Sequence, residues 1–268
     1  MTLRTVLARA LAMIRPAPSL ESVSKQHNLP YFLLHKANGK EFANWLKEIR
    51  VDLVVIYSMS QLLPQDILDI PSIGVLNLHP SLLPAYRGAN PWFWMYYDAV
   101  SQGGVTLQYI DAGEDTGDIV YQRTYAIPLG MKSPAMQDLA IGKHGVDLIL
   151  ETLKQVGQGN ALPRSVQPAQ SPTPRARNIK PGEYRMLIDW DQWPIDRIWH
   201  LMRGTELWLD CINQPTGIYS GQRWVVDDFE KTNCTVQTAA IGQVKKDEKG
   251  CYVQCRDGII RVHAEIGL

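Results

Sequence analysis

The feature that most constrains this chain is a short apolar run, IGVLNLHP at residues 73–80, into which two polar side chains are set. In an extended strand successive side chains point to opposite faces, so Asn77 and His79 share one face while Leu76 and Leu78 share the other. Ligands of open α/β sheets bind at the carboxyl ends of the strands. An amide and an imidazole side by side at such an end predict a catalytic site on a buried strand.

A second apolar run, VTLQYI at residues 105–110, leads into the polar loop DAGEDTGD at residues 111–118. The loop is short and acidic, so it can bring one carboxylate back over Asn77 and His79. Each residue taken alone has an ordinary explanation: the asparagine as a turn cap, the histidine as a structural residue, the acidic loop as a simple turn. The combination of two apolar runs, two turn-rich loops and convergent polar groups favours a catalytic site.

The motifs NLHPSLLPAYRG and DAGEDTGDI resemble those of the formyltransferase family that uses 10-formyltetrahydrofolate. Its members include methionyl-tRNA formyltransferase, glycinamide ribonucleotide transformylase and amino-sugar formyltransferases. The resemblance implies a transferase in which Asn77, His79 and Asp115 are the catalytic triad, 10-formyltetrahydrofolate is the formyl donor, and no metal takes part. It also implies a donor site formed by two loops, with the contact residues Ser60, Gln61, Leu62, Asp111, Ala112, Gly113 and Glu114.

Formyl transfer to an amine passes through a tetrahedral intermediate, which needs hydrogen-bond donors for its oxyanion and a route for the proton of the amine. Asn77 supplies an amide N–H, and a protonated His79 supplies a charge-assisted donor. A nearby carboxylate favours the imidazolium, so Asp115 is expected to raise the pKa of His79.

The rest of the chain predicts a Rossmann-like α/β domain at residues 1–156, a Pro-rich linker at 157–181 and a small domain at 182–268. Apolar spacing predicts helices at 19–27, 41–49 and 135–156, a short helix that begins at Pro64, and a strand at 29–34. The nearly continuous apolar run at 51–57 is typical of a strand in a parallel sheet that is covered on both faces, and we expect it to lie next to the strand that ends at Leu78. Short strand-like runs at 217–219, 223–228, 234–241, 251–255 and 259–263 predict a small barrel, and the resemblance implies that it is OB-like.

The amino-terminal segment, residues 1–18, is Arg-rich and free of acids, which indicates either a transit peptide or an ordinary amphipathic helix. We favour the helix. Members of the family open with a βαβ unit, so the resemblance implies that this first unit is missing here.

The composition of the chain helps to predict which amine accepts the formyl group. The 268 residues carry 27 Lys and Arg against 27 Asp and Glu, so no overall positive field recruits a polyanion. The aromatic stretch NPWFWMYY at 90–97 is either the packed start of a helix or the wall of a sugar or nucleotide pocket. We therefore expect a small amine acceptor, with an amino-sugar nucleotide first and methionyl-tRNA as the alternative. A catalytically inactive folate- or nucleotide-binding module is the alternative from another class.

The location of the protein is predicted from what the sequence contains. No apolar run reaches the length of a membrane span, and the four cysteines do not have the spacing of a zinc site. We expect a cytoplasmic protein with reduced thiols and no membrane partner.

Overall fold

The computed structural model describes residues 18–35, 38–59, 62–205, 211–215, 222–232 and 241–266. They belong to two compact units, one formed from residues 1–54 and 60–74 and the other from residues 55–59 and 75–268. The helix predicted before residue 18 and the strand predicted at 217–219 lie outside the described residues. So does the strand predicted at 234–241, apart from its last residue.

Among its described residues, the first unit has three short helices, which the sequence predicts. Helix α2 (Leu20–Gln26) is capped by Ser19, whose Oγ accepts a hydrogen bond from the backbone N–H of Ser22 at 3.1 Å. Helix α3 spans Gly39–Glu48 and α4 spans Gln65–Leu68. The strand predicted at 29–34 is wrong: this segment has no strand, and Phe32 instead packs on Phe42 and Trp45 of α3 with ring centroids 5.5 Å apart in both pairs.

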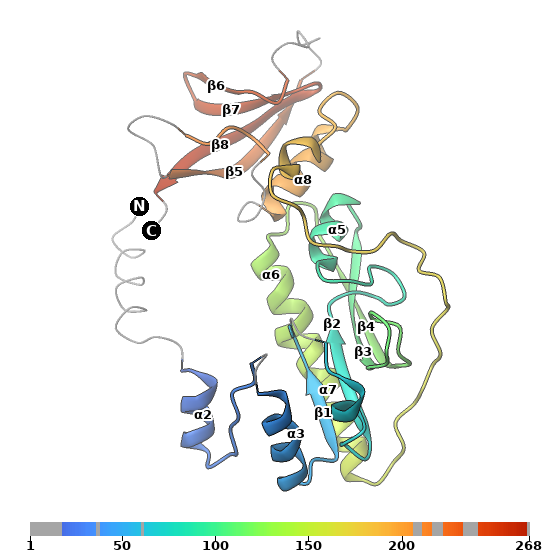
Figure 1. Cartoon of the computed structure of the whole chain (residues 1–268). Coiled ribbons are helices and arrows are strands. Elements are labelled where there is room, and N and C mark those ends of the chain that lie inside the picture. Colours follow the sequence, from blue (N-terminus) through green and yellow to red (C-terminus); the bar gives the residue numbers. More distant parts are fainter. Residues whose placement is uncertain are drawn as a thin grey trace. The chain divides into compact units, whose positions relative to one another are not determined.

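A four-stranded sheet carries the two sequence motifs, in the order β1 (Leu53–Ile56), β2 (Gly74–His79), β3 (Gln102–Tyr109) and β4 (Ile119–Ala126) (Figure 1). The neighbouring positions of β1 and β2 agree with the sequence, but β1 is only half-buried. The expectation of a parallel sheet is wrong for the other half, because β3 pairs antiparallel with both β2 and β4. A loop as short as residues 110–118 can close a hairpin but cannot make a parallel crossover.

Helices cover this sheet. The helix predicted at 135–156 is present as α6 (Ser133–Gln137), a π-helical segment (Asp138–Gly145) and α7 (Val146–Gly157) (Figure 1). The π-helical segment packs on β3 and β4, and α7 packs on β4. A side chain at Gly145 would meet the Leu78 side chain at 2.6 Å, so the absence of a Cβ lets the helix approach β2 closely. The aromatic stretch forms helix α5 (Pro91–Tyr97), with Phe93 and Tyr96 1% exposed.

The carboxyl-terminal part begins with a 3-10 turn (Glu183–Met186) and helix α8 (Ile195–Gly204). Strands β5 (Gln222–Lys231), β6 (Val244–Asp247), β7 (Gly250–Cys255) and β8 (Gly258–Ile266) follow in an antiparallel sheet of order β5-β8-β7-β6. Over the described residues this sheet is open, with edges at β5 and β6, and the expected OB-like barrel is not seen as a closed barrel.

One hydrophobic core joins α5, α8 and the carboxyl-terminal sheet. It contains Phe93, Tyr96, Ile198, Leu201 and Ile260, all at most 1% exposed. Burial of this apolar surface is the main force that stabilises this part of the fold. Within the described ranges, no helix is long and apolar enough to cross a membrane.

Candidate active site

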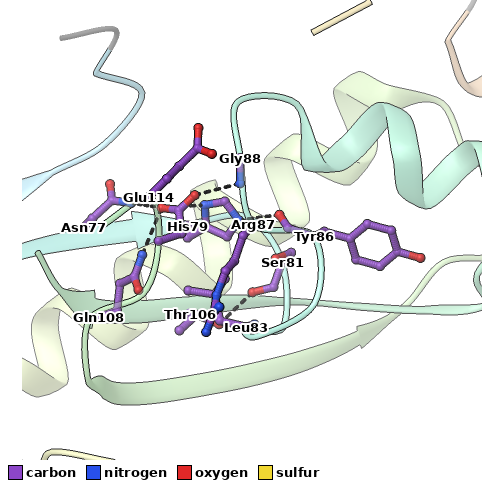
Figure 2. A network of polar contacts seen from close by, with 12 residues as sticks. Asn77, His79, Ser81, Leu83, Tyr86, Arg87, Gly88, Thr106, Gln108 and Glu114 are labelled. Atoms are coloured by element: carbon purple, nitrogen blue, oxygen red, sulfur yellow. Dashed lines mark hydrogen bonds and ion pairs between the residues drawn. The ribbon is translucent and has the colours of Figure 1, made fainter. Parts of the chain in front are cut away.

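The structure brings the three residues of the predicted triad together. Asn77 and His79 lie on β2 (Figure 2), and Asp115 lies in the loop between β3 (Gln102–Tyr109) and β4 (Ile119–Ala126). Oδ1 of Asp115 is 3.4 Å from Asn77 Nδ2 and 3.5 Å from His79 Nδ1. The two strand residues therefore share one face, as the alternation of the strand predicts.

Strand pairing explains how the loop reaches this face. In the β2–β3 register Asn77 lies opposite Gln108 and His79 lies opposite Thr106, and directly opposed residues project from the same side of a sheet. The β3–β4 register shifts between Leu107 and Gln108, and such irregularities re-aim side chains near functional sites. The chain then reaches Asp115, which adopts a left-handed backbone conformation with φ 55°.

The carboxylate of Asp115 is held at both oxygens. The backbone N–H of Gly88 donates to Oδ2 at 2.9 Å, and Gln108 Nε2 donates to Oδ1 at 3.0 Å (Figure 2). Gly88 has φ 124°, which L-residues rarely adopt, and a Cβ there would lie 2.7 Å from the carbonyl oxygen of Ala176. Only glycine therefore fits this close approach of the loop to the carboxylate.

His79 is 4% exposed, and the environment decides its protonation. Its Nε2 lies 3.0 Å from the carbonyl oxygen of Tyr86, which only accepts, so Nε2 carries the hydrogen and Nδ1 is the atom that gains or loses a proton. Burial lowers the pKa of His79 below its ordinary value of 6.5, and the negative charge of Asp115 opposes this without cancelling it. The expected raised pKa is therefore wrong, because desolvation outweighs the carboxylate.

An open cavity of about 230 Å³ borders the triad. Asn77, His79 and Asp115 contribute to its wall, together with Tyr57 and Trp92. The cavity is thus polar at the triad and aromatic at Tyr57 and Trp92, an arrangement typical of small-molecule sites.

Comparison with known proteins identifies the family. A family model described as formyl transferase matches residues 12–139. A methionyl-tRNA formyltransferase from Acetivibrio thermocellus is 31% identical over 244 residues, which cover 90% of this chain and 75% of that relative. The chain belongs to the folate-dependent formyltransferase family.

Solved structures agree with this formyltransferase in fold. HypX from Aquifex aeolicus matches with a TM-score of 0.64 and 16% identity over 90% of this chain and 41% of that chain. WlaRD, described as a sugar 3N-formyl transferase in the presence of dTDP and 5-N-formyl-THF, matches with a TM-score of 0.60 and 17% identity over 93% of this chain and 82% of that chain.

The predicted donor-binding residues of this formyltransferase are less clearly placed than its triad. Ser60 and Gln61 lie outside the described residues, and the Leu62 side chain is 92% exposed. Two neighbours of that segment, Ser58 and Met59, line the cavity instead.

In the acidic loop, Asp111, Ala112, Gly113 and Glu114 are exposed. Asp111 Oδ1 accepts from Gly113 N at 2.9 Å and from Thr116 Oγ1 at 2.7 Å, so this side chain stabilises its own turn. Glu114 is paired with the guanidinium of Arg175, with Nη2 and Oε1 2.6 Å apart. Contact with the donor stays a prediction for these four residues.

Sequence reasoning missed the groups that hold His79 and Asp115 in place. The amide of Gly88, the carbonyl of Tyr86 and the side chain of Gln108 all bind triad residues. For Gln108 a signal existed, because a polar residue within a run as apolar as VTLQYI needs a partner when it is buried. Gln167, which binds Gln108, lies in the Pro-rich segment, where its residue type carried no such signal.

Proposed function

We propose that this protein transfers the formyl group of 10-formyltetrahydrofolate to a primary amine, with Asn77, His79 and Asp115 as its catalytic residues. The observation that carries the proposal is the convergence of these three side chains at an open cavity in a chain of the formyltransferase family. A cavity filled by side chains would have favoured the inactive binding module.

Asn77 is assigned to the oxyanion. Its amide carries two N–H groups, of which one is directed toward Asp115 Oδ1 at 3.4 Å. An amide does not titrate, so its donor is available at every pH. A preorganised donor of this kind typically contributes about 10²- to 10³-fold to turnover.

His79 is assigned to the proton. Its lowered pKa leaves Nδ1 unprotonated at neutral pH, so Nδ1 accepts the proton of the amine as the bond from the amine nitrogen to the formyl carbon forms. The imidazolium then lies 3.5 Å from Asp115 Oδ1, which stabilises it. Nδ1 returns the proton to the folate nitrogen as the bond from that nitrogen to the formyl carbon breaks, and His79 ends neutral.

The cavity fits the reacting end of the donor better than the whole molecule. Its volume of about 230 Å³ lies below the range of roughly 300–1,000 Å³ that is usual for complete small-molecule sites. Tyr57, Met59 and Trp92 offer flat or apolar surface for a ring next to the triad. The loop residues 60–62 and 111–114 are proposed to hold the rest of the donor.

For the acceptor we propose an amino-sugar nucleotide. A transfer RNA requires cations that are free to meet phosphates. Three arginines that follow α7 instead pair with carboxylates of this chain. Arg164 lies 3.6 Å from a carboxylate oxygen of Asp118. Arg175 donates hydrogen bonds to Glu114, and Arg177 donates hydrogen bonds to Glu183. The formal net charge of zero points the same way.

Methionyl-tRNA is the second candidate, and the identity of 31% to a methionyl-tRNA formyltransferase supports it. Incubating the protein with 10-formyltetrahydrofolate and either a panel of nucleotide-linked amino sugars or methionyl-tRNA separates the two. Mass spectrometry should detect a product 28 Da heavier, the mass of a formyl group replacing a hydrogen, only with an amino sugar. A formylated methionyl-tRNA would transfer the assignment to the second candidate, and no product with either would favour a binding module.

A further inference from the structure

Three buried polar side chains next to the triad take no part in the steps above. Gln108 on β3 is 2% exposed, and Arg87 and Gln167 are each 8% exposed. They form a chain of hydrogen bonds that ends on the carboxylate of Asp115. Buried polar groups of this kind are costly unless each is satisfied, so their arrangement is specific.

The direction of every bond in this chain is set by its two ends. A guanidinium only donates, so the side-chain oxygen of Gln167 must face Arg87, which it does at 2.8 Å from Nη2 and 3.3 Å from Nε. The Gln167 nitrogen then faces away and donates to the Gln108 oxygen at 2.9 Å. The Gln108 nitrogen is left to donate to Asp115 Oδ1 at 3.0 Å, where a carboxylate only accepts.

The same hydrogen-bonded side chains connect the segment around Arg87 and the segment around Gln167 with the loop that carries Asp115. Gln167 also donates to the carbonyl oxygens of Asp115 at 3.1 Å and Gly117 at 2.6 Å. Arg87 also donates to the carbonyl oxygens of Pro168 at 2.8 Å and Ala169 at 3.2 Å. Residues 167–169 of the Pro-rich segment therefore all accept hydrogen bonds from Arg87, the residue before Gly88, whose amide holds the other oxygen of Asp115.

The positive charge of the buried Arg87 explains why these side chains are arranged in this way. Within the part of the chain that the structure describes, the hydrogen-bond partners of the Arg87 side chain are neutral oxygens. A buried cation is stabilised when a negative charge lies within reach, and here two amides connect it with Asp115. Hydrogen bonds in such a chain polarise one another, so the cation strengthens the donor that Gln108 presents to the carboxylate.

We propose that Gln108 and Gln167 are positioning residues, which connect the buried Arg87 with Asp115 and hold its Oδ1 toward Nδ1 of His79. The proposal rests on the proposed function for the role of Asp115. It makes residues 167–169 part of the active site.

The test replaces Gln108 by methionine, which keeps the length of the side chain and removes the donor. The matched control is Gln254→Met. Gln254 is a buried glutamine of β7, 9% exposed, and its side-chain amide donates to the carbonyl oxygens of Cys255 and Gly258, each at 3.0 Å. Thermal unfolding of both variants establishes that they are folded. Gln167→Met, one step farther from Asp115, serves as the test if Gln108→Met does not fold.

The first readout needs no acceptor. Histidine side-chain NMR of the full chain, with the His79 signal assigned by its loss in His79→Ala, gives the pKa of His79. The charges that act on His79 are those of Asp115 and, more weakly, Glu114. We expect Gln108→Met and Asp115→Asn both to lower the pKa of His79, and Gln254→Met to leave it unchanged. An unchanged or raised pKa in Gln108→Met, together with a lowered one in Asp115→Asn, would overturn the proposal.

The second readout is turnover with an amino-sugar nucleotide or methionyl-tRNA, whichever the unaltered protein formylates. Loss of a hydrogen bond to a charged group should lower kcat by about 10- to 100-fold, with the KM for the donor within about 3-fold. In an Asp115→Asn background the same change should cost nothing more, since coupled residues are not additive. Full activity of Asp115→Asn would refute the proposed function, whereas full activity of Gln108→Met beside an inactive Asp115→Asn would refute only the positioning role.

Discussion

Replacing Asp115 by asparagine keeps the shape of the side chain and removes its charge. Three donors converge on the carboxylate, Gly88 N on Oδ2 at 2.9 Å, and Gln108 Nε2 and Asn77 Nδ2 on Oδ1 at 3.0 Å and 3.4 Å. An asparagine offers one acceptor oxygen, so one of these donors must face an amide nitrogen. The imidazolium that His79 forms during the reaction also loses the negative charge 3.5 Å from Nδ1.

The size of the effect follows from that distance. Two unit charges 3.5 Å apart interact by about 5 kcal/mol at an effective dielectric constant of about 20, which sets an upper limit. The hydrogen bond lost to the carboxylate is worth about 1.5–3 kcal/mol. Since about 1.4 kcal/mol corresponds to a factor of ten, we expect kcat to fall by roughly 10²- to 10³-fold. The affinity for the donor should change by less than about 3-fold, because Asp115 serves the transition state.

The dependence on pH gives a second and independent check. In the proposed mechanism neutral His79 is the active form, so kcat should fall as the pH is lowered through the pKa of His79, which burial places below 6.5. Asp115 opposes that lowering, so the asparagine variant should have a still lower pKa, and its acid limb should move to lower pH.

Tetrahydrofolate formation, followed from about pH 5 to pH 8.5 for both proteins, measures the profile. A rate that instead falls as the pH rises through 6.5 would show that the imidazolium is the active form. An asparagine variant with full activity at every pH would show that Asp115 only satisfies the amides around it.

Three further predictions follow from single residues. His79→Ala should lower turnover by at least about 10³-fold while donor binding, titrated directly, stays within a few-fold; equal losses in both would make His79 structural. Gly88→Ala should lower the free energy of unfolding by about 1–3 kcal/mol and remove most of the activity, because φ 124° and the carbonyl oxygen of Ala176 at 2.7 Å exclude a Cβ. An unchanged midpoint of urea unfolding would refute this. The pKa of His200 is lowered by burial, and its Nδ1 accepts from Gly130 N at 2.9 Å, so the unfolded chain binds more protons and stability should fall as the pH drops below about 6.5. His200→Gln should weaken that dependence, and an identical urea midpoint at every pH would contradict it.

Local pattern was sufficient for much of the site. The alternation in LNLH places Asn77 and His79 on one face whatever the rest of the chain does, because the period of a strand is two. Hydrophobic spacing also located most helices and strands, and the polar loop after the second apolar run supplied Asp115. These features depend on neighbours in the chain, which the sequence displays directly.

Other features depended on residues that meet only after folding. The pairing of β3 with both β2 and β4 reversed the expected direction of half the sheet, because strand direction is set by the path of the loops and not by the apolar pattern. Gln167 reaches Gln108 from a segment whose composition indicates a linker. The sequence by itself determined which groups could do the chemistry. The tertiary structure decided the pKa of His79, because the sequence shows the neighbouring carboxylate but not the burial that outweighs it.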